Sequence, residues 1–230
     1  MTNSNDYIGS ELELFSHAKI WKRYWAEKLI PFIQGPVLEV GAGLGSNTKL
    51  LVTKEMSWHQ LEPDLEFYHK LKKINQNKKN CEAFHGFLND HEIGEYQTII
   101  YIDVLEHIQK DQQELKIAAS RLKKNGCLIV LSPAHQFLMS NFDINIGHFR
   151  RYNKSMLRDL CPKRMVVKKQ FYLDSVGLLA SFAAHFIKSG NPTSKQIFFW
   201  DRIMVPVSKI LDPLLFFSVG KTIITIYEKK

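Results

Sequence analysis

Residues 37–48 read VLEVGAGLGSNT, an apolar run that opens into three glycines at alternate positions, Gly41, Gly43 and Gly45. A glycine-rich turn between a strand and a helix lets the backbone approach a ligand, because no β-carbon stands in the way. The turn also points the first N–H groups of the helix at that ligand. The stretch therefore predicts a ligand-binding turn, with a tight strand-to-helix turn that holds no ligand as the alternative.

Apolar strands and polar, helix-compatible stretches alternate on both sides of this turn. Strands are expected at residues 37–40, 58–63, 81–86, 98–104, 127–133, 164–173 and 222–230, and helices at 11–32, 47–55, 66–77, 111–125 and 156–161. Strands spaced by helices predict a parallel sheet with crossover connections. The runs TIIYI and CLIVL are continuously apolar, which is typical of central strands covered on both faces. We expect the helix over 111–125 to end at Asn125 and Gly126, because both tolerate a positive φ.

The composition fits a single sizeable domain. The chain has 230 residues, of which 45% are hydrophobic, and a formal net charge of +8. Its amino terminus is polar and acidic without a signal pattern, and no apolar run is long enough to span a bilayer. We therefore expect a cytoplasmic protein, either free or peripheral on the inner membrane face. The widely spaced Cys81, Cys127 and Cys161 are expected to be reduced thiols.

Two carboxylates flank the glycine turn. Glu39 lies in the apolar strand just before it, where a carboxylate is costly unless a positive or hydrogen-bonding group meets it. Glu62 ends the next strand, 17 residues after Gly45, where a carboxylate can accept from both hydroxyls of a ribose. Dinucleotides and S-adenosylmethionine both bring a ribose to this place. The dinucleotide fingerprint is G-x-G-x-x-G, whereas this chain has G-A-G-L-G, and the nearby acid suits a cationic ligand better than a pyrophosphate.

Three motifs occur in one order along the chain: VLEVGAGLGSNT, then LEPD at 61–64, then YIDVLEHIQ at 101–109. In these motifs the chain resembles class I S-adenosylmethionine-dependent methyltransferases, and it is similar to a bacterial branch with DVLEH and GHFRRY motifs. The resemblance implies an α/β, Rossmann-like fold with a mostly parallel seven-stranded sheet and helices on both faces. The expected product is S-adenosylhomocysteine. Apart from the resemblance, an amino-terminal helix is expected because Leu14, Ala18, Trp21, Trp25 and Leu29 recur at helical spacing. The apolar stretches near the carboxyl end predict a helical cap.

The resemblance assigns cofactor roles to residues at the ends of four strands. Glu39 is expected to hold the methionine amino end, and Glu62 the ribose. The full set of expected cofactor-binding residues is Glu39, Gly41, Ala42, Gly43, Gly45, Glu62, Pro63, Phe87, Leu88, Asp103, Val104 and Leu105. Phe87 and Leu88 are expected at the adenine, and Asp103 and Val104 at the methionine and sulfonium. Asp90 is an alternative contact near the adenine.

The segment GHFRRY, residues 147–152, is expected to form the acceptor wall, because it follows the fifth strand at the carboxyl edge of the sheet. His148 is a candidate base, the arginine pair Arg150 and Arg151 a candidate clamp for an anionic group, and Tyr152 a candidate for orienting it. Solvated arginines and a packed histidine are the alternatives. His107 is a second candidate base and acceptor contact, with a structural role at a helix start as its alternative.

Methyl transfer from a sulfonium is an in-line displacement, so positioning in a water-poor site is its main requirement. The sequence shows no dense set of carboxylates and histidines for a metal, and we expect metal-free methylation at oxygen. The expected acceptor is a small molecule, a sugar or a lipid-linked glycan, including anionic ones. A nucleic-acid role is the main alternative, because residues 148–169 hold eight basic residues against one acidic residue. The fourth strand ends in DVLE rather than in an Asn-Pro-Pro-Tyr-type motif, which disfavours nucleic acid.

The expected organisation is an amino-terminal helical segment over 1–35, a methyltransferase core over 36–172 and 221–230, and an apolar helical insertion over 173–220. The insertion contains SVGLLASFAAHFI and ILDPLLFFSV, with Pro206 and Pro213 expected as breakers. It is expected either to close over the acceptor, to form a homodimer face, or to lie on an anionic membrane beside Lys188, Lys195 and Lys209. A membrane-bound interaction module with a vestigial cofactor site is the remaining alternative.

Overall fold

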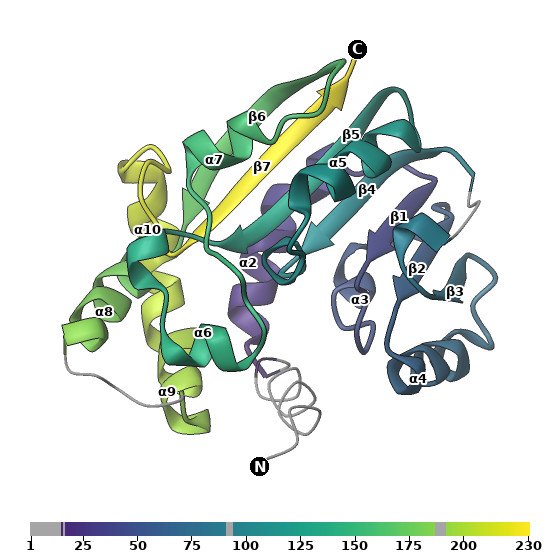
Figure 1. Ribbon diagram of the computed structural model, residues 1–230. Helices are drawn as coiled ribbons and strands as arrows, with labels where there is room; N and C mark the ends of the chain where they lie inside the picture. Colours follow the sequence, from purple (N-terminus) through teal and green to yellow (C-terminus); the bar gives the residue numbers. More distant parts are fainter. Residues whose placement is uncertain (1–14, 16, 91–93, 187–191) are drawn as a thin grey trace.

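The computed structural model describes residue 15 and residues 17–90, 94–186 and 192–230, and in this part of the chain a seven-stranded sheet forms the centre (Figure 1). The strands are β1 (Val37–Val40), β2 (Trp58–Glu62), β3 (Cys81–His85), β4 (Tyr96–Ile102), β5 (Leu122–Pro133), β6 (Met165–Leu173) and β7 (Thr222–Lys229). Their order is β3-β2-β1-β4-β5-β7-β6, and β7 runs antiparallel to both of its neighbours. The expected α/β fold with a mostly parallel sheet is confirmed.

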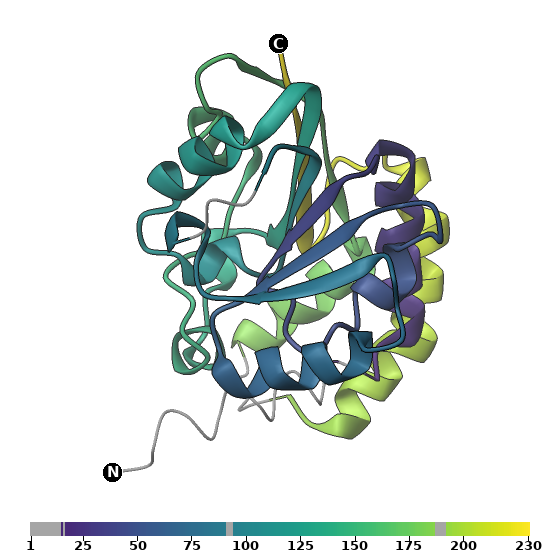
Figure 2. The same cartoon turned by 90° about the vertical axis from the view of Figure 1, so that its right-hand side faces the viewer.

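Helices pack on both faces of the sheet. They are α2 (Lys19–Leu29), α3 (Thr48–Leu51), α4 (Leu65–Asn75), α5 (Asp111–Ser120), α6 (Asn141–Asn145), α7 (Lys154–Asp159), α8 (Ser175–Phe186), α9 (Ser194–Phe199) and α10 (Val205–Leu214). Short 3₁₀ turns cover Ile30–Phe32, Leu88–Asp90, Leu105–His107 and Gln136–Leu138, and a π-helical turn, η5, covers Trp200–Met204. Figure 2 shows α2 and α10 side by side over one face, with α5 over the other.

The apolar runs of the central strands supply two core layers. Ile100 and Ile129 pack into the layer under α2, whereas Ile99 and Leu128 pack into the layer under α5. All four side chains are fully buried. Successive side chains on a strand point to opposite faces, so a strand covered on both faces needs apolar residues throughout. Burial on both faces therefore explains why TIIYI and CLIVL are continuously apolar.

The expected start of the fifth strand was wrong. Helix α5 ends at Ser120, and β5 begins at Leu122, five residues before the expected strand. Asn125 has the expected positive φ, +62°, but it lies within the strand where the register against β4 shifts. At Gly126 a β-carbon would lie 2.8 Å from the carbonyl oxygen of Lys123. The Asn-Gly pair therefore makes an irregularity in a strand instead of ending a helix.

Helix α2 buries one stripe against the sheet. Trp21, Trp25 and Leu29 are buried on it, as the helical spacing predicted, and Ala18 is buried just before its first residue. Leu14 was expected on the same stripe and lies outside the described residues. All three cysteines are free thiols, which confirms their expected state.

The prolines of the apolar insertion do not interrupt it as expected. Helix α9, the π-turn η5 and helix α10 follow one another without a gap from residue 194 to residue 214. Pro206 lies in the first turn of α10 and Pro213 near its last residue. Pro206 closely follows the π-helical turn η5, where the hydrogen-bond pattern of the α-helix is already interrupted, so the helical path continues through a residue without an N–H.

Candidate active site

The chain order of the strands reverses beside β1, whose neighbours are β2 and β4. The turn after β1 therefore meets the end of β4 at the carboxyl edge of the sheet, where open parallel sheets bind ligands. Gly41, Gly43 and Gly45 all have positive φ, between +55° and +71°. At Gly41 a β-carbon would lie 2.7 Å from a methyl group of Val104. The glycines thus let this turn approach the end of β4 closely.

Glu62 lies directly beside the glycine turn. Its Oε2 accepts a hydrogen bond from the Gly43 N–H at 2.7 Å, and its Oε1 accepts one from the Asp64 N–H at 3.0 Å. Burial raises the pKa of this carboxyl, and the two N–H donors oppose that rise. The side chain is therefore held at the end of β2 next to the turn, the place expected for a ribose contact.

Glu39 is buried in β1 with one oxygen satisfied and one not. Its Oε2 accepts hydrogen bonds from the Thr48 hydroxyl and from Trp58 Nε1, the latter at 2.9 Å. Its Oε1 is buried without a hydrogen-bond partner. Burial raises the pKa of Glu39 to about 7. An orphaned buried carboxylate oxygen is costly, and a cation or donor placed beside it would remove that cost.

Lys22 reaches the same place from helix α2, although no motif pointed to it. Its Nζ donates to the Ser46 hydroxyl at 2.7 Å, and its charge interacts with Asp103 and Glu39. Burial lowers the pKa of Lys22, and these two acids oppose the change. In sequence, Lys22 is one of several cations on an amphipathic helix. Lys22 differs from the other cations of α2 only in that the packing of this helix places it against the glycine turn.

The end of β4 adds Asp103, whose φ is +54° and whose N–H is held by the Leu131 carbonyl at 2.9 Å. Solvent reaches the Asp103 side chain, yet the protein around it raises its pKa to about 6. The charges of His148 and Lys22 act against that rise. A carboxylate, a lysine and the orphaned oxygen of Glu39 thus meet around the glycine turn.

The remaining expected cofactor residues divide between the surface and the core. Phe87 is 63% exposed and Pro63 is exposed, so both are accessible beside Glu62 and the end of β3. Leu88 and Leu105 are buried in the layer under α5, and Ala42 is 4% exposed within the turn. Cofactor contact by these residues stays a prediction.

A second cluster lies just past the end of β4, where Glu106, His107 and His148 come together. The rings of His107 and His148 meet edge to face with centroids 4.5 Å apart, and His148 Nε2 lies 3.9 Å from Glu106 Oε1. Glu106 is fully buried, and this Oε1 has no hydrogen-bond partner. Burial and the charge of Asp103 hold the pKa of Glu106 well above its usual range. Solvent reaches His107, yet the protein packed around its ring and the charge of His148 lower its pKa to about 4.

Asp143 fixes the orientation of His148. Its Oδ1 lies 3.1 Å from His148 Nδ1 and 2.7 Å from Arg151 Nη2, and its Oδ2 accepts from the Ser140 hydroxyl. Burial alone would raise the pKa of Asp143, but the bond to His148 and the charge of Arg151 hold it well below the usual range. An ionised carboxylate only accepts hydrogen bonds, so Nδ1 of His148 carries the proton. In the neutral ring, Nε2 is then the acceptor, on the side of Glu106 and His107.

The arginines of GHFRRY are paired within the chain. Arg150 Nη1 lies 2.7 Å from Asp111 Oδ2, which also accepts the Tyr152 hydroxyl at 2.9 Å. The Arg151 guanidinium is nearly buried on Asp143. An anionic acceptor would have to compete with these acids, so acceptor contact by Arg150, Arg151 and Tyr152 stays a prediction. Their observed contacts fasten the segment that carries His148. Asp143 and Asp111 were missed in the sequence, because neither belongs to a motif.

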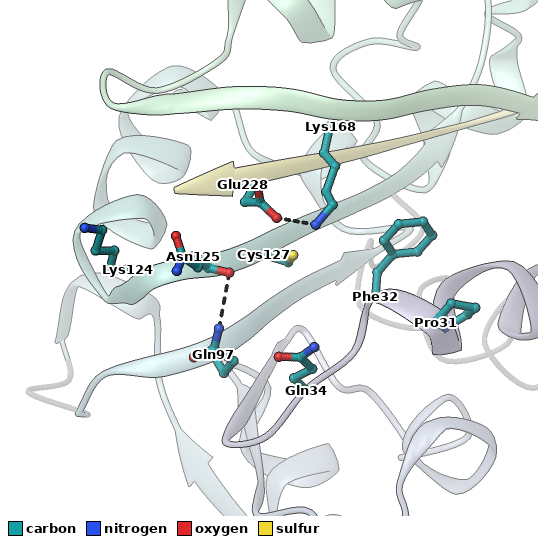
Figure 3. A pocket seen from close by; sticks show the side chains of 9 residues that line it. All are labelled: Pro31, Phe32, Gln34, Gln97, Lys124, Asn125, Cys127, Lys168 and Glu228. Carbon is teal, nitrogen blue, oxygen red and sulfur yellow. Dashed lines mark hydrogen bonds and ion pairs between the residues drawn. The ribbon is translucent and has the colours of Figure 1, made fainter. Parts of the chain in front are cut away.

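A cavity of about 490 Å³ lies at the opposite edge of the sheet (Figure 3). It is lined by Pro31, Phe32, Gln34, Gln97, Lys124, Asn125, Cys127, Lys168 and Glu228. Hydrogen bonds join Gln97 to the Asn125 carbonyl and Lys168 to Glu228 across it. These residues stand at the amino ends of β4 and β5 and at the end of β7, so the cavity is separate from the candidate active site.

Comparisons with known proteins agree with this geometry. A family profile described as a methyltransferase domain matches residues 17–167, more than half of the chain. No curated protein sequence matches the chain. Among solved structures, a SAM-dependent methyltransferase from Archaeoglobus fulgidus has a TM-score of 0.62 at 16% identity, covering 96% of this chain and 97% of that one.

Two further solved structures carry more specific descriptions. Coclaurine N-methyltransferase, bound to N-methylheliamine and S-adenosylhomocysteine, has a TM-score of 0.61 at 14% identity over 91% of this chain and 72% of that one. Mitomycin 7-O-methyltransferase has a TM-score of 0.57 at 12% identity over 91% of this chain and 54% of that one. At these identities the likeness concerns the fold.

The residues around the glycine turn fit the cofactor of this family. The orphaned Oε1 of Glu39 and the carboxylate of Asp103 suit a cationic group, Lys22 suits a carboxylate, and Glu62 suits a ribose. The sequence profile, the sheet order and this set of donors and acceptors agree. The chain belongs to the methyltransferase domain family, as a class I methyltransferase whose cofactor is S-adenosylmethionine.

Proposed function

We propose that the chain transfers a methyl group from S-adenosylmethionine to a hydroxyl oxygen of a small-molecule, sugar or lipid-linked glycan acceptor, without a metal. The observation that carries this proposal is the Asp143–His148 pair, which leaves Nε2 of His148 as a proton acceptor next to the end of β4. A hydroxyl needs a base to lose its proton, whereas an amine needs only to arrive uncharged. A histidine held in this tautomer therefore favours an oxygen acceptor.

S-adenosylmethionine supplies an electrophilic methyl group on a sulfonium. Glu39 and Asp103 would hold its ammonium, Lys22 its carboxylate and Glu62 its ribose, and the glycine turn lets the backbone pass beneath it. The side chains of Glu39, Lys22 and Glu62 are held by hydrogen bonds within the chain, and Asp103 is held through its backbone N–H. The binding site is therefore organised before the cofactor arrives, which reduces the free-energy cost of ordering it.

In the proposed step, the acceptor oxygen forms a bond to the methyl carbon while the bond from that carbon to sulfur breaks. The hydroxyl proton moves to Nε2 of His148, and Asp143 stabilises the resulting imidazolium. His107 is solvent-exposed beside His148, so it would contact the acceptor. The raised pKa of Glu106 favours its neutral form, which would not trap the transferred proton.

The test is S-adenosylhomocysteine release with panels of hydroxylated small molecules, sugars and lipid-linked glycans. His148→Gln is expected to lower kcat by about 10²- to 10⁴-fold, the usual contribution of a general base, while the affinity for S-adenosylhomocysteine stays within about twofold. His107→Gln serves as the matched variant and should affect KM more than kcat. Transfer only to amines, with His148→Gln as fast as the parent chain, would contradict the proposal.

The metal-free part of the proposal has its own test. Glu106, His107 and His148 place ligand atoms within 4.8 Å of one another, and within the part of the chain that the structure describes they are the one such group. We expect dialysis against a chelator to leave the methyl-transfer rate unchanged. If the rate falls and a divalent cation restores it, these three residues bind a metal and the proton route through His148 is wrong.

A further inference from the structure

The helical stretch over residues 194–214 has an unusual distribution of polarity. Its buried side, which faces α2 and α8, carries three polar residues, Asp201, Ser208 and Asp212, beside only two apolar ones, Ile197 and Val205. Its outer side carries five exposed apolar residues, here called the apolar stripe: Phe199, Ile203, Val207, Ile210 and Leu214. Residues three and four apart share a helix face, so these spacings define two opposite faces. A surface helix normally buries its apolar face.

The buried acids explain why the polar side faces inward. Asp201 accepts hydrogen bonds from the N–H groups of Ile20 and Trp21 at 3.2 and 2.8 Å, and so caps the start of α2. Asp212 accepts from the N–H groups of Asp174 and Ser175 at 2.8 and 3.0 Å, and so caps the start of α8. These bonds satisfy amides that no intrahelical partner reaches. The orientation of the helix is thereby fixed by polar contacts, and its apolar stripe is left outside.

The apolar stripe is too exposed to be a normal monomer surface. Ile210 and Leu214 are 67% and 68% exposed, and Phe199 and Ile203 are 56% and 54% exposed. The adjoining helix α8 adds Leu179 at 69%. Contiguous apolar patches of this kind mark contacts with other proteins or with membranes. Figures 1 and 2 show α9, α10 and α8 along one side of the molecule, with α2 beside α10.

Charge decides which contact this face makes. Lys195, Arg202 and Lys209 recur every seven residues along one border of the apolar stripe. Lys209 pairs with Glu27 at 3.2 Å, and Lys19 and Arg23 are exposed on the neighbouring α2. The stretch 194–214 has no exposed acid, because Asp201 and Asp212 are both buried. A second copy would bring the same excess of cations, and the acid at this border, Glu27, is already paired with Lys209, whereas an anionic bilayer supplies the opposite charge.

We propose that the apolar stripe and its basic border dock this protein on the surface of a membrane that contains anionic lipids. The helix would lie in the interface plane, with the stripe among the acyl chains and the basic side chains at the headgroups. Its 21 residues measure about 30 Å, since an α-helix rises about 1.5 Å per residue. None of the helices in the described residues is long and apolar enough to cross a bilayer, which leaves a parallel orientation for this stretch. The inference rests on this face alone and does not depend on the acceptor.

Flotation of the full chain with vesicles tests the proposed membrane docking. The parent chain should float with vesicles of phosphatidylcholine and phosphatidylglycerol, and less with phosphatidylcholine alone. Ile203→Glu with Ile210→Glu should weaken binding at least about tenfold, because two apolar side chains leave the interface. Both positions are exposed, so the melting temperature should stay unchanged. Lys195→Glu with Arg202→Glu should remove the preference for the anionic vesicles.

Ile74→Glu is the matched control, because Ile74 is 49% exposed at the far helix α4. It should bind vesicles like the parent chain. The proposal is wrong if the parent chain binds neither vesicle, or if the Ile203/Ile210 double variant binds as well as the parent. It is also wrong if light scattering shows a dimer that the double variant splits while no vesicle is bound, because the stripe would then be a subunit interface.

Discussion

Gly41 carries two constraints at once, a φ of +66° and a neighbouring Val104 methyl group 2.7 Å from where its β-carbon would lie. The sequence predicted a close backbone approach here, but it predicted a ligand as the neighbour. The structure adds a neighbour from the chain itself, the first residue after Asp103. Because Gly41 combines a positive φ with this close contact, we expect it to tolerate no side chain.

Gly41→Ala is therefore expected to lower the free energy of unfolding by about 1–3 kcal/mol, the usual cost of a strained residue, and to weaken S-adenosylhomocysteine binding. Urea unfolding and calorimetry measure the two effects. Gly94→Ala is the control, because a β-carbon there would meet nothing within 4 Å. Adding Val104→Ala should restore part of the stability. A neutral Gly41→Ala variant would show that the turn adopts another conformation.

Glu39 should make stability depend on pH. Its pKa is about 7 in the folded chain against 4.5 in the unfolded chain. Between these values the folded state holds a proton that the unfolded state has lost, so this residue lowers stability as pH rises from 4.5 to 7. The penalty is fully present above pH 7 and is on the order of 3 kcal/mol, at about 1.4 kcal/mol per pKa unit.

Glu39→Gln removes that penalty and keeps an oxygen for Thr48 and Trp58. The variant should therefore gain stability over the parent chain at pH 8, with the gain fading toward pH 5, as measured by denaturant unfolding across this range. It should also bind the cofactor more weakly, because the ammonium loses a carboxylate. A difference in stability that is the same at pH 5 and pH 8 would contradict the assignment.

Lys22, Asp111 and Asp143 mark the limit of sequence reasoning at the residue scale. The motif residues Glu39 and Glu62 were found because their positions relative to the glycines carry chemical meaning. Lys22 precedes Gly41 by 19 residues and lies on another element, and Asp143 is one acid in the short helix α6. Ser46 meets Lys22 only through the packing of α2, whereas His148 follows Asp143 by five residues and contacts it through the local path of the chain.

At the element scale, the long helix over 194–214 shows why an apolar stretch is hard to interpret. Its prolines predicted breaks, and its hydrophobicity predicted a cap over the acceptor, a homodimer face or a membrane-facing surface. In the structure, Asp201 and Asp212 lie on the buried side beside Ile197 and Val205, because the two acids cap two other helices from within the core. A cap supplied from a distant element leaves no local signature, since its donors lie far away in sequence.

We therefore expect replacement of Asp201 to lower the free energy of unfolding, because its side chain caps α2. Asp201→Ala leaves the N–H groups of Ile20 and Trp21 buried without a partner, at an expected cost of about 2 kcal/mol in the free energy of unfolding. Asp201→Asn keeps an acceptor and should recover about half of it. Thermal and denaturant unfolding measure both variants. Equal stability of the alanine variant and the parent chain would show that α2 starts without this cap.

For the whole molecule, the sheet order places the glycine turn, Glu62 and Asp103 at one edge, and three motifs in sequence order sufficed to predict that arrangement. The resemblance to class I methyltransferases implied a mostly parallel seven-stranded sheet, but the order of the strands was not predicted, because periodicity identifies strands without ordering them. The acceptor side was less predictable. GHFRRY was located correctly after the fifth strand, but the pairing of its arginines with Asp111 and Asp143 depends on tertiary contacts.

Calorimetry with S-adenosylhomocysteine and with a nicotinamide dinucleotide tests the central claim, a site around the glycine turn for a nucleoside that carries an amino acid. The account predicts saturable binding of S-adenosylhomocysteine with one site per chain, and no binding of the dinucleotide. Glu62→Ala should weaken that binding at least about tenfold, since it removes a carboxylate that accepts hydroxyl hydrogen bonds. Binding of the dinucleotide alone, or S-adenosylhomocysteine binding that Glu62→Ala leaves unchanged, would contradict it.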